Sequence, residues 1–187
     1  LSPIVDCGVH YIDVMCQMTR SKPVSVSAIG ARLTPDISVD NYNYGQLQLR
    51  FEDGSVGWYE AAWGPMVSET AFFVKDVIGP KGSVSITAKH AGASGKSDHM
   101  DSHTKTESIR IHHADIDSKN EFTKSDEWID MADEPGHQEL CDREQAYFLK
   151  AIMENVDLTD HLDDAINSLK IAFACDESVK TGEIIKV

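Results

Sequence analysis

The sequence predicts an α+β fold, in which a large, open and mainly antiparallel sheet carries its helices on one face. Three observations predict it. Helical periodicity covers both ends of the chain, strand-like alternation with short turns fills the middle, and the elements come in blocks rather than in alternation. The 187 residues suit one sizeable domain with a core of its own, and we expect residues 1–187 to form it.

Residues 5–20 form the first expected helix, because polar residues recur there at spacings of three and four among apolar ones. Pro23 stops any continuation, since it lacks an N–H and biases the residue before it away from helical angles. Gly8 lies opposite the polar side of this helix, where we expect close packing against another element.

The β-rich middle of the chain follows Pro23. Residues 47–52 alternate between apolar and polar side chains, which predicts a half-buried strand. Asp53-Gly54 then favours the tight turn of a hairpin, and Gly-Pro-Lys-Gly at residues 79–82 makes a second turn. The expected strands are residues 24–28, 47–52, 56–63, 72–78, 84–87 and 108–112.

Two long irregular stretches and two helices complete the chain. Residues 88–106 are polar, small and repetitive, which is typical of a surface loop, and residues 115–135 are acidic and irregular. Helices are expected at residues 138–155 and 162–181, the second with an apolar stripe from Leu162 to Phe173. Gly182 is a natural residue to end this helix, and a short final strand closes the chain.

Charge and composition exclude several classes of protein. The formal net charge is -14 without a basic patch, which argues against nucleic-acid binding and against an anionic membrane surface. No apolar run is long enough to span a bilayer, and the first residues lack a secretion signal. The four cysteines lie far apart, as reduced core residues do, which favours a cytoplasmic protein. Because the chain begins with Leu rather than Met, we expect it to be part of a longer one.

The most distinctive segment is DCGVHYID, residues 6–13. At about 100° per residue, Asp6, His10 and Asp13 fall on one narrow side of the helix, and the same stripe continues to Gln17 and Arg20. The apolar arc around the rest of the helix is wide. We therefore expect this helix to be buried except along the polar stripe.

Two interpretations of the stripe stay open. It is either the solvated face of an amphipathic helix, with Asp6 a favourable charge at the positive helix end, or part of an active site. Asp6 lies four residues before His10, so its carboxylate would orient the imidazole and support its protonated form. Such a pair suits general acid/base catalysis near neutral pH. Metal binding by the pair lacks an evident third ligand.

Other candidate sites have weaker patterns. A loose His-rich region matches no tight metal-ligand spacing, and a solvated loop is the simpler interpretation. The chain contains neither a GxGxxG motif nor a P-loop, and the GASG at residues 92–95 has the wrong spacing. We therefore assign no metal site and no dinucleotide-binding loop. The histidines concerned are His90, His99, His103, His112 and His113.

Three aromatic residues near the hairpin have two possible roles. Trp58, Tyr59 and Trp63 fit the substrate side of the sheet, and they fit equally a core or an interface, which is the commoner place for such residues.

Taken in order, these segments resemble a known family. DCGVHYID resembles the D-x-G-x-H-x-x-D motif of the Gfo/Idh/MocA family, which includes glucose–fructose oxidoreductase and inositol dehydrogenase. YGQLQLRFEDGSVG is similar to the family's hairpin and VIGPKGSV to its Gly-x-x-Gly turn. REQAYFLKAI resembles the penultimate helix, and AINSLKIAFACDESVKTGEIIKV the closing helix and strand. The match covers most of the chain, with departures at residues 88–106 and near Asp130.

The resemblance implies that residues 1–187 are the C-terminal substrate-binding and oligomerisation domain of an NAD(P)-dependent dehydrogenase or oxidoreductase. In that family an N-terminal Rossmann domain binds NAD or NADP and carries both the Gly-rich motif and a catalytic lysine in a Glu-Lys-Pro motif. No Rossmann domain is expected in this chain, so the chain alone should be inactive. The implied substrate is a sugar, a cyclitol or a related polyol.

The resemblance also implies roles for single residues. Asp6 and His10 match the family's catalytic acid/base pair: His10 would take the proton of the substrate hydroxyl as hydride leaves the same carbon for nicotinamide, and Asp6 would orient His10. Asp6, His10, Asp13 and Trp63 are the expected substrate-binding residues, with Asp13 in a supporting hydrogen-bonding role. His10 alone would touch the cofactor.

The open face of the sheet carries one further expectation. In the family this face often mediates dimers or tetramers, and a sheet with helices on one face only needs a second cover, so a homo-oligomer is implied. An alternative from another class is a non-catalytic binding or oligomerisation module that kept the fold and lost the chemistry. Asp6 and His10 would then be incidental polar residues. A Rossmann-type motif and a Glu-Lys-Pro stretch upstream of Leu1 would favour the enzyme.

Overall fold

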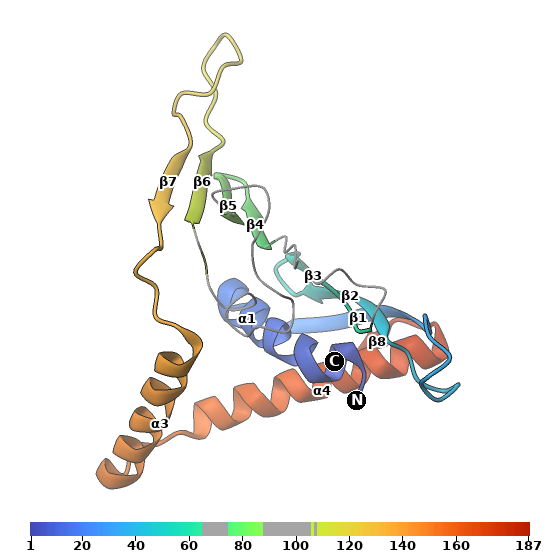
Figure 1. The fold of residues 1–187 in the computed structure, drawn as a ribbon. Helices are drawn as coiled ribbons and strands as arrows, with labels where there is room; N and C mark the ends of the chain where they lie inside the picture. Colours follow the sequence, from blue (N-terminus) through green and yellow to red (C-terminus); the bar gives the residue numbers. More distant parts are fainter. Residues whose placement is uncertain (65–74, 88–105, 107) are drawn as a thin grey trace. The chain divides into compact units, whose positions relative to one another are not determined.

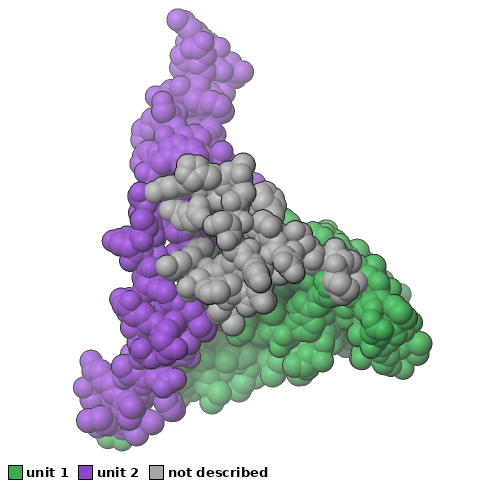
Figure 2. Space-filling model, in the orientation of Figure 1, with its two compact units in different colours: residues 1–67, 155–187 green, residues 68–154 purple. Residues whose placement is uncertain are grey.

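The computed structural model describes residues 1–64, 75–87, 106 and 108–187. The chain divides into two compact units, which are coloured separately in Figure 2. Unit 1 comprises residues 1–67 and 155–187, and unit 2 comprises residues 68–154. That residues 1–187 act together as one domain stays a prediction.

The sheet of unit 1 has four strands in the order β3-β2-β1-β8, and every neighbouring pair is antiparallel. Gly54 has φ +86° in the turn between β2 and β3, so the predicted Asp-Gly hairpin is confirmed. The strands are β1 (Pro23–Ala31), β2 (Tyr44–Phe51), β3 (Val56–Ala62) and β8 (Ile185–Lys186).

The first predicted helix is present but begins differently from the prediction. Its opening turn, η1 (Ile4–Gly8), is a π-helix, and α1 (Val9–Thr19) continues it as an α-helix. The helix ends where Arg20 takes a left-handed conformation with φ 52°, and Pro23 begins β1. A π turn is rare and frequently marks a functional site. The polar stripe therefore starts in a wider turn than regular helical spacing predicts.

The last helix, α4 (Thr159–Thr181), begins three residues before its predicted start. Asp157 lies just before this start, and its carboxylate accepts hydrogen bonds from the backbone N–H and the hydroxyl of Thr159, the first residue of the helix, at 2.9 and 2.6 Å. Gly182 ends the helix with φ 72° and donates its N–H to the carbonyl of Ser178 at 2.8 Å, so this helix stop is confirmed.

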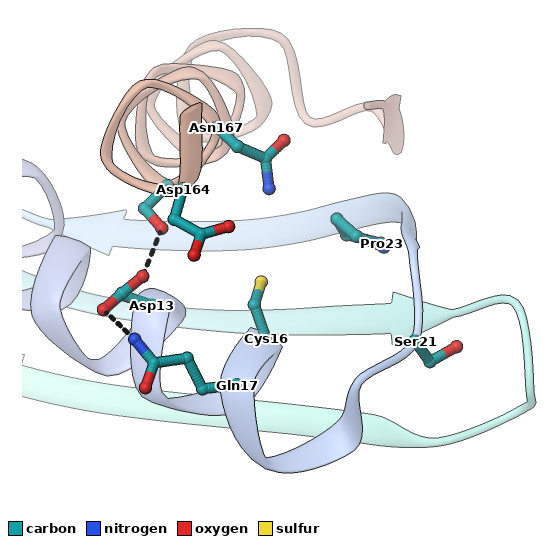
Figure 3. A pocket seen from close by; sticks show the side chains of 8 residues that line it. Asp13, Cys16, Gln17, Ser21, Pro23, Asp164 and Asn167 are labelled. Atoms are coloured by element: carbon teal, nitrogen blue, oxygen red, sulfur yellow. Dashed lines mark hydrogen bonds between the residues drawn. The ribbon is translucent and has the colours of Figure 1, made fainter. Parts of the chain in front are cut away.

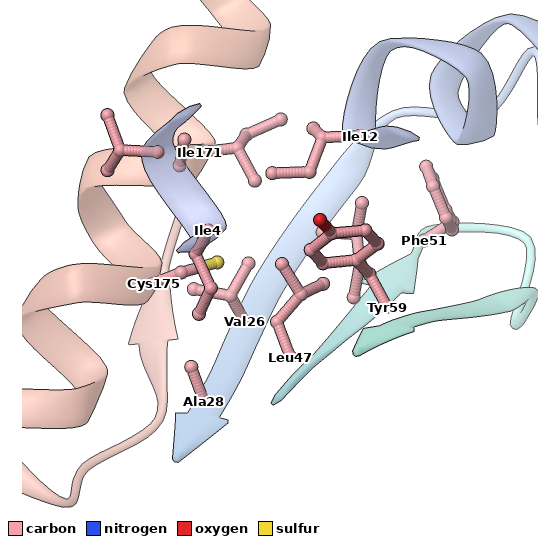
Figure 4. Close-up of a cluster of buried hydrophobic side chains, with 12 residues drawn as sticks. Ile4, Ile12, Val26, Ala28, Leu47, Phe51, Tyr59, Ile171 and Cys175 are labelled. Carbon is pink, nitrogen blue, oxygen red and sulfur yellow. The ribbon is translucent and has the colours of Figure 1, made fainter. Parts of the chain in front are cut away.

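The core of unit 1 lies between these helices and one face of its sheet (Figures 1 and 4). Leu47, Leu49 and Phe51 point into it, whereas Gln48 and Arg50 between them are exposed, so the period-two prediction for this strand is confirmed. The helices contribute fully buried side chains, among them Ile4, Ile12 and Ile171.

The face of α4 that packs on this core includes only Ala172 of the predicted stripe. Leu162, Ile166, Leu169 and Phe173 are 40–59% exposed. The buried side carries Ile171 and four small residues, namely Ser168, Ala172, Cys175 and Ser178. Small side chains let the helix approach the sheet closely, and the Ser178 hydroxyl bonds both elements: it accepts the Ala28 N–H at 2.9 Å and donates to the Glu183 carbonyl at 2.6 Å.

Unit 2 contains a second antiparallel sheet, in the order β4-β5-β6-β7, and the helix α3 (His137–Glu154). The Gly-Pro-Lys-Gly turn between its first two strands is confirmed. Gly82 is required there, since it has φ +141° and an added Cβ would lie 1.9 Å from the His112 carbonyl oxygen. The strands are β4 (Lys75–Gly79), β5 (Gly82–Thr87), β6 (Ser108–His113) and β7 (Glu127–Asp130).

Strand β7 corrects the prediction that residues 115–135 are irregular. Trp128 and Ile129 favour a strand, but the acidic residues around them obscure this pattern in the sequence. In the structure they pair with Arg110 and Ile109 of β6. The α+β class and the antiparallel pairing are confirmed. Among the described residues the strands form two sheets of four, and residues 65–74, which join the two, lie outside that part.

Candidate functional site

The helix η1–α1 that carries the motif lies against strand β3. An added Cβ at Gly8 would lie 3.0 Å from Cε1 of Tyr59, and the Tyr59 ring stacks on Tyr11 with ring centroids 5.0 Å apart. The prediction that Gly8 marks a close approach is therefore confirmed. The glycine of the motif has a physical role: it sets the helix directly on the sheet, so that the residues on its other side point outward.

Asp6 and His10 are both exposed on this helix. Within the described residues no hydrogen bond or ion pair joins their side chains. In the described part of the chain, the side chain of Asp6 makes one hydrogen bond, with the thiol of Cys7, whose Sγ lies 3.9 Å from Oδ2. Both groups are thus accessible to a ligand on the helix surface, and the orienting contact between them stays a prediction.

Asp13 has a different environment, half-buried between helices α1 and α4. One carboxylate oxygen accepts a hydrogen bond from the Gln17 amide at 2.9 Å, and the other accepts one from the Ser168 hydroxyl of α4 at 3.3 Å. Figure 3 shows both bonds. Its predicted role as a hydrogen-bonding support agrees with this geometry, and its role toward a substrate stays a prediction.

Asp13 also lines a pocket of about 200 Å³. This volume lies below the roughly 300–1,000 Å³ of typical ligand sites, and six of the eight lining residues are polar. Asp6 and His10 are not part of the lining. The sequence had given no reason to single out Asp164, Asn167 or Ser168, because the predicted stripe of α4 was apolar. The lining residues are Asp13, Cys16, Gln17, Ser21, Pro23, Asp164, Asn167 and Ser168 (Figure 3).

The two cysteines on this helix are protonated thiols rather than activated nucleophiles. Burial raises the pKa of Cys7, and the neighbouring carboxylate of Asp6 raises it further. Burial likewise raises the pKa of Cys16, with added contributions from Asp13 and Asp164. Burial and the neighbouring carboxylates therefore disfavour a thiolate at both positions.

The three aromatic candidates differ in how far the structure exposes them. Tyr59 belongs to the core, whereas Trp58 is 54% and Trp63 is 37% exposed. Asn43, which sequence reasoning missed, holds the backbone at Trp63: its side-chain amide donates to the Trp63 carbonyl at 2.6 Å, and its own carbonyl accepts the Trp63 N–H at 2.7 Å. Substrate contact by Trp63 stays a prediction.

The His-rich region is described only in part, because His90, His99 and His103 lie outside the described residues. His112 and His113 of β6 each contact a carboxylate, Asp126 at 2.8 Å and Glu127 at 2.6 Å. In the described part of the chain no group of three or more His, Cys, Asp or Glu could hold a metal ion.

Comparison with known proteins shows what this chain is similar to. Residues 2–85, which contain the motif helix and the sheet strands β1 to β3, match the model of a family described as the GFO/IDH/MocA C-terminal domain. The resemblance to the Gfo/Idh/MocA family is confirmed. No curated protein matches the chain.

Solved structures with the same fold include three oxidoreductases. One from Agrobacterium radiobacter, in complex with NAD+, L-tartaric acid and magnesium, is 12% identical with a TM-score of 0.68, over 98% of this chain and 48% of that one. Levoglucosan dehydrogenase, in complex with NADH and levoglucosan, is 18% identical at 0.67, over 97% and 49%. Aldose-aldose oxidoreductase from Caulobacter crescentus, complexed with glycerol, is 17% identical at 0.64, over 96% and 46%.

These likenesses concern the fold, and the chain spans about half the length of each of these structures. Among the residues that the structure describes, no helix is both long and apolar enough to cross a membrane.

Proposed function

We propose that this chain is the C-terminal, substrate-binding domain of an NAD(P)-dependent oxidoreductase that acts on a sugar, cyclitol or related polyol. The observation that carries the proposal is the arrangement of the motif helix. Gly8 is packed on Tyr59, while Asp6 and His10 are exposed on the same short segment. The family match and the oxidoreductases of the same fold support the class of reaction.

In this proposal the two exposed residues handle a proton. His10 accepts the proton of the reacting hydroxyl, and Asp6 turns toward the imidazole once a substrate excludes water from the helix surface, which favours the protonated ring. Asp13 stays bonded to Gln17 and Ser168 and keeps the neighbouring turn of the helix in place. The nicotinamide cofactor supplies the hydride-accepting carbon.

The chain itself offers little to a dinucleotide. It has no GxGxxG motif to cradle a pyrophosphate, and its charge of -14 is unfavourable to phosphate groups. The proposal therefore assigns NAD or NADP binding to a Rossmann domain preceding this chain in the intact protein, with His10 as the contact from this side. In this proposal the chain alone is inactive. The intact protein that contains it acts in the cytoplasm.

The experiment uses the intact protein that contains this chain, assayed with NAD+ and NADP+ against D-glucose, myo-inositol and levoglucosan by the absorbance of the reduced nicotinamide. With an active substrate in hand, His10→Ala should lower turnover by about 10²–10⁴-fold, the usual range for general acid/base catalysis. His112→Ala, which removes a histidine of unit 2, serves as the matched control and should leave turnover within about twofold.

Full activity of the His10→Ala variant would contradict the catalytic role of His10. A protein that binds neither nicotinamide cofactor and oxidises none of these compounds would favour the alternative, a non-catalytic module with the same fold. Asp6→Asn keeps the size of the side chain but removes its charge. Its turnover should lie between that of the wild type and that of His10→Ala, because the imidazole is still present but its protonated form is less strongly supported.

A homo-oligomer is the second part of the proposal. On the sheet face of unit 1 that points away from the core, Ile29, Val56 and Trp58 are 54–74% exposed. A second copy covering this face would remove them from water, and stable interfaces bury about 1,200–2,000 Å² in total. Val56→Arg with Trp58→Glu should then convert an oligomer to a monomer in light scattering, and a wild-type protein that is already monomeric would contradict the idea.

A further inference from the structure

A carboxylate on α4 holds the start of the motif helix. Oδ1 of Asp176 accepts a hydrogen bond from the Ser2 hydroxyl at 2.8 Å, and the same oxygen accepts one from the Tyr42 hydroxyl. The Ser2 hydroxyl in turn accepts the backbone N–H of Val5 at 3.2 Å, and the Ser2 carbonyl accepts that of Asp6 at 3.0 Å. One carboxylate oxygen is thus connected through Ser2 to the two amides that open the turn carrying Asp6.

Among the described residues, no other side chain caps the start of η1. Its first flanking residue, Pro3, makes no side-chain capping hydrogen bond, and a helix start leaves its first N–H groups without partners inside the helix. Ser2 ties this turn down because Asp176 fixes the position of its hydroxyl.

Tyr42 holds Asp176 from the other side. Its ring is seated against two glycines of neighbouring strands: an added Cβ at Gly30 would lie 2.8 Å from the ring, and one at Gly45 would lie 2.9 Å from it and 3.0 Å from Ile4. Burial, together with the bond to Asp176, raises the pKa of Tyr42, so the hydroxyl keeps its proton and remains a donor. No Lys or Arg of the described residues pairs with Asp176.

We propose that Asp176 and Tyr42 are positioning residues for the turn η1, and that they set through Ser2 where Asp6 and the following His10 stand on the helix surface. The kinetic half of this proposal rests on the proposed function. Its structural half does not, because the hydrogen bonds that link the Val5 and Asp6 amides to Ser2, and the Ser2 hydroxyl to Asp176, are independent of any reaction. Neither residue touches the exposed side chains themselves, so their effect reaches the site through the backbone.

The structural half is tested on the 187-residue chain by amide hydrogen exchange. Tyr42→Phe keeps the ring on its two glycines and removes only the hydroxyl. It should speed exchange at Val5 and Asp6 about 3–10-fold, while the amides of Leu47 and Leu49 change less than twofold. Tyr44→Phe is the matched control, since the hydroxyl of Tyr44 in β2 bonds the exposed Glu60 of the neighbouring strand β3 at 2.9 Å, and this variant should leave all four amides unchanged.

Two results would overturn this half. Unchanged exchange at Val5 and Asp6 in Tyr42→Phe would mean that the hydroxyl holds nothing in the turn. A rise shared equally by Leu47 and Leu49 would mean that Tyr42 stabilises the whole unit rather than positioning the turn.

The kinetic half is tested on the intact protein, with the substrate that the assay under the proposed function identifies. Tyr42→Phe and Asp176→Leu should lower kcat about 3–10-fold with KM changed less than twofold, whereas Asp176→Asn, which keeps an acceptor oxygen for both hydroxyls, should restore most of the rate. Loss of rate through KM alone, or no rescue by Asn, would overturn the positioning role. If His10→Ala were fully active while exchange at Val5 and Asp6 responded as expected, the proposed function would fail and the structural half would stand.

Discussion

The two units of this chain differ in how they are held together. Of the buried apolar residues in the described chain, all but one lie in unit 1, and the exception is Ala151 of α3. In unit 1 the helices and the sheet share one continuous core (Figure 4). The motif helix therefore stands on a rigid base, which is what a site needs if its groups are to keep their positions.

Unit 2 has comparable elements but few buried apolar side chains among its described residues. Val77, Val84 and Ile129 on one face of its sheet are 41–48% exposed, and Tyr147, Phe148, Leu149, Ile152 and Met153 of α3 are 51–78% exposed. The four strands of this sheet are nevertheless paired along their backbones, although these side chains are exposed. The comparison teaches that secondary structure in this chain does not by itself indicate where the stability lies.

The largest expected difference between the two units is in the free energy of unfolding lost when a side chain is truncated. Ile12→Ala in α1 removes a side chain with no exposed area, and it should lower the free energy of unfolding by about 2–5 kcal/mol. Ile129→Ala in β7 removes the same atoms from a position that is 43% exposed, and it should cost less than about 1 kcal/mol. Urea unfolding of the chain measures both. Equal costs at the two positions would show that unit 2 is as well packed as unit 1.

Much of unit 1 could be predicted because its local signals agree. Alternation in β2, Asp-Gly in the hairpin and Gly182 at the end of α4 each specify one structure, and all three are confirmed. The packing face of α4 could not be predicted, since apolarity pointed to the stripe from Leu162 to Phe173. Close approach to the sheet selects small residues instead, and a serine such as Ser178 looks like surface until its bonds to Ala28 and Glu183 are known.

The candidate site was predictable to a similar extent. Sequence periodicity brought Asp6, His10 and Asp13 to one side of a helix, and Gly8 to the packed side, where the structure has it. Periodicity cannot reveal partners from distant segments, so Ser168 beside Asp13 and the contacts among Ser2, Tyr42 and Asp176 were missed. These contacts join residues more than a hundred positions apart, and no local pattern encodes them.

An alkaline pH should weaken unit 1 selectively. Burial is the main cause that raises the pKa of Cys175 to about 12, above its ordinary value of 9.0. Because the folded pKa is raised, this contribution is fully present below pH 9 and is lost as the pH rises toward 12. From Cys175 alone the free energy of unfolding should fall by about 2–3 kcal/mol between pH 8 and pH 11.

The measurement is urea unfolding at both pH values, for the wild type and for Cys175→Ala. The variant should show a smaller drop, since it has no thiol to ionise on unfolding. Its remaining drop belongs in part to Tyr42 and Tyr59, whose pKa values burial also raises. An identical drop in wild type and variant would contradict the assignment to Cys175.

The smallest expected effect compares one glycine from each unit. Gly8→Ala adds a methyl group 3.0 Å from the Tyr59 ring, whereas at Gly79 in β4 an added Cβ meets nothing within 4 Å. Overpacking costs about 1–3 kcal/mol, and alanine recovers up to about 1 kcal/mol of that through its helix propensity. Gly8→Ala should therefore destabilise the chain by about 1–2 kcal/mol in urea unfolding, and Gly79→Ala by less than about 0.5 kcal/mol. A stabilised Gly8→Ala would mean that the helix can lift from Tyr59 without loss, and the exposed Asp6 and His10 would then have no fixed base.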